Sequence, residues 1–126
     1  MAEVHLSARC FPTEDRAKVI GSITSAFPDA VISGEDPIEA SASSTDMFAE
    51  LLKRQRIRDA ARAVLRRGVR GNMTRFRLNK QVAAIGKMSF SEEDHPLGDI
   101  EVTIVSDDIA AVIDSIAPNT RLERGA

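Results

Sequence analysis

Positive charge in this chain is concentrated in one segment, residues 53–87, which holds twelve of the seventeen Lys and Arg residues and a single acidic residue, Asp59. The segment has a formal charge of +11 and the other 91 residues have −13, although the whole chain carries only −2. A fold must keep most of these cations in water, because an unpaired buried charge is strongly unfavourable. Charge separated in this way indicates a polyanionic partner, and nucleic acid is the first interpretation.

The length and composition predict one soluble domain. The chain has 126 residues, 43% of them apolar and 29% charged, which suits a single α+β domain over residues 1–126 with a frayed polar tail at 119–126. Residues 1–15 lack the order of a signal peptide and no apolar run is long enough to span a bilayer, so we expect a cytoplasmic protein. Cys10 is the only cysteine and we expect it to be a packing residue.

The residue pattern predicts strands and helices in mixed order. Alternating apolar residues predict strands at 3–10, 30–33, 38–42, 73–78, 87–90 and 100–104, the second and third forming a hairpin. Helical spacing predicts helices after Thr13, over 44–67, after Asn79 and over 109–116. We therefore expect an α+β fold in which a single mixed sheet is covered on one face by helices.

The helical region at 44–67 contains two apolar stripes that are out of phase. Ile57, Val64 and Leu65 share one face of an ideal helical wheel, whereas Phe48 and Leu52 lie nearly opposite. One straight helix cannot bury both faces against one core, so we expect a break near residues 53–56 or a partner that covers the second face.

The basic residues of this segment are the candidate RNA-binding surface. Arg58, Arg62 and Arg66 recur every four residues on one side of the predicted helix, and Arg75 and Arg77 point outward from the next predicted strand. A row of this kind is usually held by acidic partners, but only Asp59 is close in sequence. The predicted RNA-binding residues are Lys53, Arg54, Arg56, Arg58, Arg62, Arg66, Arg67, Arg70, Arg75, Arg77, Asn79, Lys80, Gln81 and Lys87.

Catalytic and metal-binding patterns are weak. His5 and His95 are far apart, and neither has the neighbours of a zinc site or of a catalytic triad. The acidic run at 92–94 has the composition of a charged turn, and the G-x-x-G sequence at 68–71 is followed by a strand pattern rather than by the helix of an RNA-binding module of that type. We predict no enzymatic activity, no metal and no cofactor.

Several phrases in fixed order carry a resemblance to a known family. They are FPTED at 11–15, LLKRQRIRDAARAVL at 51–65, LNKQVAAIGKMSF at 78–90 and PLGDIEVTIVSDDI at 96–109. Over roughly residues 4–118 the chain resembles a small archaeal family of uncharacterised proteins that are predicted to bind RNA. The resemblance implies a cytosolic archaeal protein whose fold is like a domain of the large-subunit ribosomal protein L-five, and it implies no catalytic residues.

The composition also indicates how RNA is bound. Arginine suits phosphate oxygens, whereas readers of single strands stack bases on exposed aromatic side chains, and this chain has no Trp or Tyr. We therefore expect structured or double-stranded RNA, bound mainly through phosphates, with Asn79 and Gln81 near 2′-hydroxyls. The alternative is a non-catalytic interaction module that pairs with an acidic partner or with a second copy. Its candidate dimer patch comprises Met47, Phe48, Leu51 and Leu52.

Overall fold

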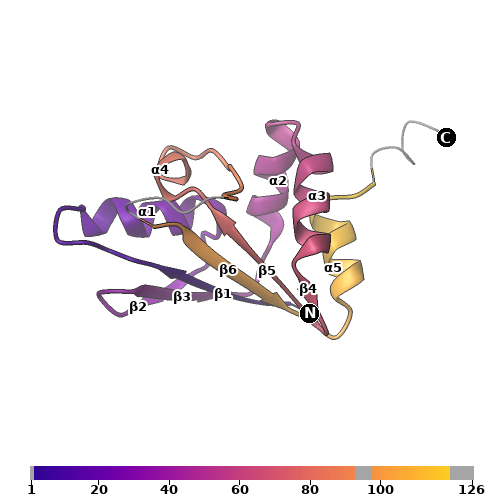
Figure 1. Ribbon diagram of the computed structural model, residues 1–126, viewed down its shortest axis with the longest axis horizontal. Helices are drawn as coiled ribbons and strands as arrows, with labels where there is room; N and C mark the ends of the chain where they lie inside the picture. Colours follow the sequence, from indigo (N-terminus) through magenta and orange to yellow (C-terminus); the bar gives the residue numbers. More distant parts are fainter. Residues whose placement is uncertain (1, 93–97, 120–126) are drawn as a thin grey trace.

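The computed structural model describes residues 2–92 and 98–119. The helices all lie on one side of a single sheet (Figure 1). The elements in chain order are β1 (Glu3–Ala8), α1 (Arg16–Ala26), β2 (Val31–Ser33), β3 (Ile38–Ala42), α2 (Asp46–Arg54), α3 (Arg58–Arg67), β4 (Val69–Arg70), β5 (Met73–Leu78), α4 (Lys80–Ala83), β6 (Ile100–Val105) and α5 (Ile109–Ile116).

The six strands form one sheet in the order β2-β3-β1-β6-β5-β4. Alternation decides which face is covered: Val4, Leu6 and Ala8 of β1 are buried, while Glu3 and His5 face outward. The same alternation continues in β3, β5 and β6. The α+β class with helices over one face is confirmed. The sheet itself is antiparallel at every described pairing, where we expected a mixed sheet.

The core lies between the sheet and the helices and is centred on aromatic rings. The ring of Phe48 in α2 stacks on Phe27, with centroids 5.4 Å apart, and on Phe76 of β5 at 5.6 Å. Phe90 meets Phe76 edge to face at 5.7 Å. Such pairs add about 1 kcal/mol each beyond the burial of their area. The arrangement fixes α2 above β5, which places the basic segment at one edge of the sheet.

The break predicted in the long helical region is confirmed. One helix ends at Arg54 and the next begins at Arg58, so both apolar stripes reach the same core: Phe48 and Leu52 from α2, and Leu65 from α3, are fully buried. This corrects the proposed dimer patch. Only Met47, 37% exposed, and the partly buried Leu51 remain at the surface, so the four residues do not form an apolar patch for a second copy.

Three local features differ from the sequence prediction: the cap of the first helix, the segment at 87–90 and the position of Cys10. The first helix is capped by Asp15, whose side chain accepts from the backbone N–H of Ala17, rather than by Thr13. Segment 87–90 is no strand but a single bridge between Phe90 and Leu78. Cys10 lies beyond the end of β1 and is partly exposed. The expectations for residues 93–95, including His95, and for the tail from 120 onward fall outside the described residues.

A paired arginine and aspartate close the far end of the sheet. The guanidinium of Arg9 donates to both carboxylate oxygens of Asp36, at 2.7 and 3.1 Å, and the backbone N–H of Cys10 donates to the same group. These hydrogen bonds hold the pKa of Asp36 below its ordinary 3.8 and raise that of Arg9. Arg9 is one of the five cations outside the segment at 53–87, and its guanidinium is paired with Asp36.

Candidate nucleic-acid interface

The corner between α2 and α3 presents basic side chains on a strained turn. Arg56 has φ of +59°, and among the described residues it is the one non-glycine with positive φ. The N–H of Ile57 donates to the carbonyl of Leu52, and the N–H of Arg56 donates to that of Lys53, each at 3.1 Å. These two bonds form a Schellman motif, in which the left-handed position is usually glycine.

Replacing Arg56 with glycine should raise the free energy of unfolding by about 1 kcal/mol. Glycine occupies the left-handed region without the steric cost of a Cβ, and Arg56 is exposed with no packing to lose. Chemical denaturation followed by circular dichroism measures this difference. If the variant were clearly less stable than the wild type, the arginine side chain would contribute to the fold. A gain in stability would indicate that arginine is kept at this corner for another reason.

Gln55 joins the segment that follows α4 to this corner. Its side-chain amide donates to the carbonyl of Met88 at 3.0 Å, and its side-chain oxygen accepts from the N–H of the same residue at 2.6 Å. This two-way contact fixes the segment after α4 against the end of α2. Lys87, the neighbour of Met88 in sequence, is exposed.

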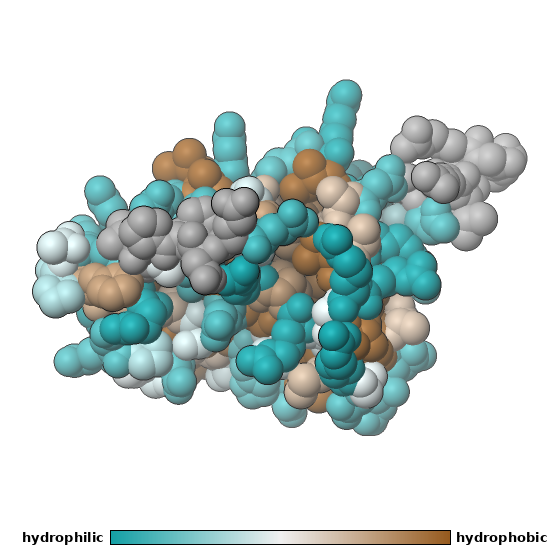
Figure 2. Space-filling view, in the orientation of Figure 1, coloured by the Kyte–Doolittle hydropathy of each residue, from teal (hydrophilic) through white to brown (hydrophobic). Residues whose placement is uncertain are grey.

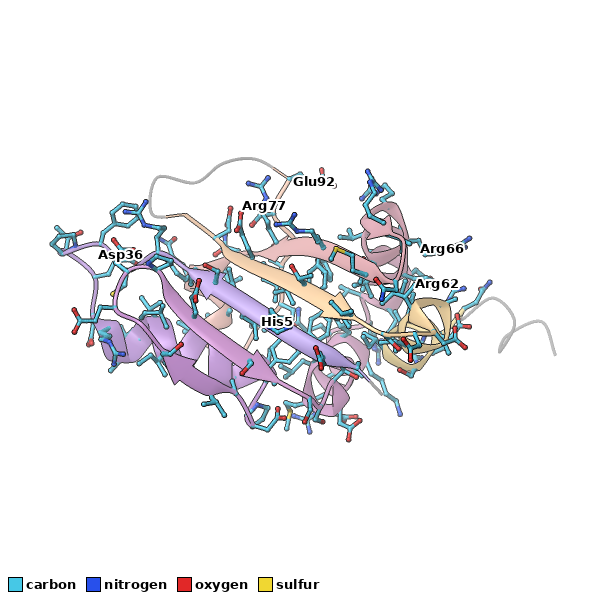
Figure 3. All side chains as sticks on the ribbon, turned by 90° about the horizontal axis from the view of Figure 1, so that it is seen from below. His5, Asp36, Arg62, Arg66, Arg77 and Glu92 are labelled. Carbon is cyan, nitrogen blue, oxygen red and sulfur yellow. The ribbon has the colours of Figure 1, made fainter. Side chains whose placement is uncertain are left out.

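The predicted arginine row on α3 faces α5 and is partly occupied. The guanidinium of Arg62 donates to the carboxylate of Asp114 and to the carbonyl of Ala117, and its side chain is only 21% exposed. Arg58 is half buried and Arg66 is exposed. Figure 3 shows Arg62 and Arg66 together at the end of the molecule where α3 and α5 meet. Arg62 therefore fastens α5 to α3, which limits its use as an RNA contact.

The end of α3 lies very close to β5. A Cβ on Gly68 would collide with the backbone carbonyl oxygen of Arg75, so only glycine permits this approach. The N–H of Arg75 donates to the carbonyl of Gly68, and the buried hydroxyl of Thr74 donates to that of Leu65. This contact fixes the C-terminal end of α3 against the backbone of β5.

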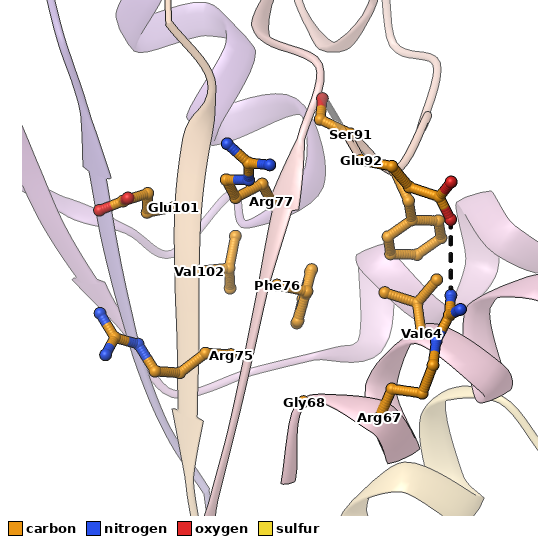
Figure 4. Close-up of a pocket in the computed structure, with 11 residues that line it drawn as sticks. Val64, Arg67, Gly68, Arg75, Phe76, Arg77, Ser91, Glu92, Glu101 and Val102 are labelled. Carbon is orange, nitrogen blue, oxygen red and sulfur yellow. Dashed lines mark ion pairs between the residues drawn. The ribbon is translucent and has the colours of Figure 1, made fainter. Parts of the chain in front are cut away.

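A hollow of about 550 Å³ opens between α3, β5 and segment 90–92. It lies between two pairings along the outer edge of β5: β4 pairs with Met73 and Thr74, and segment 90–91 contacts Arg77 and Leu78. Figure 4 shows Phe76 and Val64 inside the hollow, with Arg67 and Glu92 facing each other at its mouth. The lining residues are Val64, Arg67, Gly68, Arg75, Phe76, Arg77, Phe90, Ser91, Glu92, Glu101 and Val102.

The two outward arginines of β5 lie on the uncovered face of the sheet, as the alternation predicts. Arg75 is exposed and extends over β6 (Figure 4). Arg77 is half buried, and its guanidinium lies 3.8 Å from the carboxylate of Asp99. Seen from the uncovered face, Arg77 lies near Glu92, at a distance from Arg62 and Arg66 (Figure 3). The arginines of α3 and β5 thus occupy two sides of one sheet edge.

Two residues predicted to contact RNA have structural roles instead. Lys80 is 2% exposed, and its ammonium donates to the carbonyl of Arg9 at 2.8 Å and to the carboxylate of Glu14 at 2.9 Å. The side-chain oxygen of Asn79 caps α4 by accepting from the N–H groups of Gln81 and Val82. The sequence predicted this cap correctly. Because the side-chain oxygen of Asn79 is engaged in the cap, it is not free to contact RNA. Gln81 remains exposed.

Six of the predicted cations have no carboxylate partner among the residues that the structure describes: Lys53, Arg56, Arg66, Arg70, Arg75 and Lys87. All six are exposed. Arg54 pairs with Glu50 one helical turn away, and Arg67 pairs with Glu92 at 3.5 Å in full contact with solvent. We call these six together with Arg67 the basic edge. Its members lie at the α2–α3 corner, in the last turn of α3, on β4, on the uncovered face of β5 and in the segment after α4.

Four residues that shape this interface were missed by sequence reasoning. Gln55 and Gly68 position the basic residues, and Phe90 and Glu92 line the hollow. The glycine was recognised only as a helix end. Gln55 carried a weak signal, because a polar residue at a predicted helix break is a natural place for a tertiary contact. Nothing local in the sequence distinguishes Phe90 from a core residue.

The fold and this surface define an α+β protein with a group of exposed, unpaired cations. A family model described as RNA binding matches residues 3–106. The chain is 42% identical to the UPF0201 protein of Sulfolobus acidocaldarius, over 95% of this chain and 90% of that one. It superposes on the crystal structure of the UPF0201 protein from Methanococcus jannaschii with a TM-score of 0.86 and 38% identity, covering 93% of each chain.

The chain belongs to the archaeal UPF0201 family, whose model is the RNA-binding one. It also matches the UPF0200/UPF0201 protein of Archaeoglobus fulgidus with 37% identity, but there it spans only 38% of the relative's length. Within the described residues no group of His, Cys, Asp and Glu side chains could hold a metal ion, and no helix is long and apolar enough to cross a membrane. The family assignment confirms the predicted archaeal family, whose model is described as RNA binding.

Proposed function

We propose that this protein binds structured or double-stranded RNA through the basic edge, mainly by contacts to phosphates and without catalysis. One observation carries the proposal: six exposed cations from a single segment have no carboxylate partner in the described structure. In a chain of net charge −2 with nineteen acidic residues, cations left unpaired in this way favour an external polyanion.

The geometry favours phosphates over base edges. The cations come from several elements, namely a helix corner, a helix end, two strands and a loop, rather than from a single helix that could enter a groove. The ten residues of α3 span about 15 Å, which separates Arg56 from Arg75 by the width of several phosphates. Gln81 is exposed and available for a contact to a 2′-hydroxyl.

We also propose that the fold is like that of a domain of the ribosomal protein L-five and that the protein is cytoplasmic.

Salt dependence tests the proposal directly. If about six phosphates are neutralised, the logarithm of the association constant for a duplex RNA should fall against the logarithm of salt concentration with a slope of about −4 to −5. Fluorescence anisotropy with a labelled RNA duplex measures the slope. A flat response would remove the proposal, because each phosphate contact that it invokes releases a counterion.

A further inference from the structure

The hollow beside α3 is lined by apolar side chains together with arginines and the carboxylates of Glu92 and Glu101. Val64 and Phe76 lie inside, and the ring of Phe90, which is only partly buried, stands edge to face against Phe76. In the space-filling view, brown and tan surface remains uncovered between long hydrophilic side chains where Figure 1 places α3 and β5 (Figure 2). Phosphate binding requires only the arginines. The apolar surface next to them therefore indicates a second kind of contact.

The cation nearest the hollow is held only loosely. Arg67 meets Glu92 at 3.5 Å, with the two side chains 67% and 76% exposed, so this pair contributes little and opens at little cost. A phosphate at the mouth would replace Glu92, because it carries the same sign of charge and offers more acceptor oxygens to the planar guanidinium. Arg75 also lines the hollow, but its guanidinium extends over β6, away from Arg67.

A fully paired duplex cannot use the interior. Its bases are stacked and its surface consists of sugars and phosphates, whereas the interior offers apolar side chains and an aromatic ring. A nucleotide that has left the stack presents a flat apolar base and a phosphate together, which matches the lining. Stacking of one base on an aromatic side chain contributes about 1–3 kcal/mol, or roughly 5- to 150-fold in affinity.

We propose that this hollow binds one unpaired nucleotide of a structured RNA, with its base against Phe90 and its phosphate against Arg67. The inference rests on the proposed function and deepens it: the basic edge holds the paired stem, and the hollow selects RNA that contains a bulge or a loop nucleotide beside that stem. The hollow, about 550 Å³ and widely open to solvent, leaves room for a single base beside Phe90.

Two RNA duplexes of equal charge test the inference. One is fully paired and the other has a single bulged 2-aminopurine, and both carry a distant label for anisotropy at one salt concentration. We expect the bulged duplex to bind about tenfold more tightly and its 2-aminopurine fluorescence to be quenched on binding. Equal affinities without quenching would overturn the nucleotide site and leave the proposed function intact. Absence of binding to either duplex would overturn both. Competition by an acidic peptide as strong as that by RNA would also overturn the site.

A variant that fills the hollow locates the effect. Val64→Trp places a large side chain inside it from the flank of α3, whereas Ala63→Trp adds the same side chain on the exposed side of the same helix. The first should lose the preference for the bulged duplex and keep the affinity for the paired one, and the second should behave as the wild type. Phe90→Leu keeps the apolar contact without the ring and should weaken the quenching. If Val64→Trp retained the full preference, the base would lie elsewhere.

Discussion

Replacing Lys80 with alanine is expected to lower the free energy of unfolding by about 3–5 kcal/mol, the largest effect of any single change to a basic residue of this chain. Lys80 and Glu14 form an ion pair whose side chains are 3% and 12% exposed. The same carboxylate oxygen also accepts from the N–H of Phe11. Without the ammonium, Glu14 would be a nearly buried charge and the carbonyl of Arg9 would lose its donor. Denaturant unfolding followed by circular dichroism measures the loss.

Two further variants make the interpretation specific. Lys87→Ala removes the same charge from an exposed position and should change stability by less than about 0.5 kcal/mol. Lys80→Met combined with Glu14→Leu removes both charges and should recover part of the stability, because no buried charge is left unpaired although the Arg9 carbonyl and the Phe11 N–H lose their partners. A cost below about 1 kcal/mol for Lys80→Ala would show that water reaches the pair. When folded, Lys80→Ala should bind RNA as the wild type does.

Local pattern was sufficient for most of the elements. Alternation in β1, β5 and β6 identified the covered face of the sheet, and the opposed stripes around Phe48 and Leu65 required the break that the structure contains. These features depend on residues within a few positions of one another, where periodicity is a physical constraint. The order of the strands depends on long-range pairing and could not be predicted in this way.

The fate of individual cations could not be predicted, because their partners are remote in sequence. Lys80 is buried by Arg9 and Glu14, 71 and 66 residues earlier, and Arg62 is held by Asp114, 52 residues later. A helical turn with an exposed lysine has the same sequence as one whose lysine turns inward. The count of positive charges therefore predicted a basic surface, but not which members of the segment contribute to it.

The hollow could not be predicted from the sequence either. It depends on the shortness of β4 and on the close approach at Gly68, which together leave the middle of β5 without a neighbouring strand. Neither feature produces a periodic pattern in the sequence, because both depend on where the pairing between neighbouring strands ends. Sequence composition argued against base stacking because Trp and Tyr are absent, yet the partly exposed ring of Phe90 supplies one aromatic surface at the basic edge.

Removing one cation from each end of the basic edge should weaken RNA binding far more than removing two cations elsewhere. The double variant Arg56→Gln/Arg75→Gln deletes exposed charges from the α2–α3 corner and from β5. If each contacts a phosphate, the affinity for duplex RNA should fall about 10- to 100-fold near 0.1 M salt, and the slope against salt should become shallower by about 1.5–2. Both quantities come from the same anisotropy titrations.

The matched control is Arg16→Gln/Lys18→Gln, which removes the same number of charges from the exposed start of α1. Its slope should stay within about 0.5 of the wild type, because long-range attraction is screened beyond about 10 Å at this salt concentration. Equal losses in the two double variants would mean that overall charge, and not this edge, attracts the RNA. A change of slope in the first variant alone would require one RNA molecule to contact both ends of the edge at once, because each lost contact removes about one counterion from the binding equilibrium.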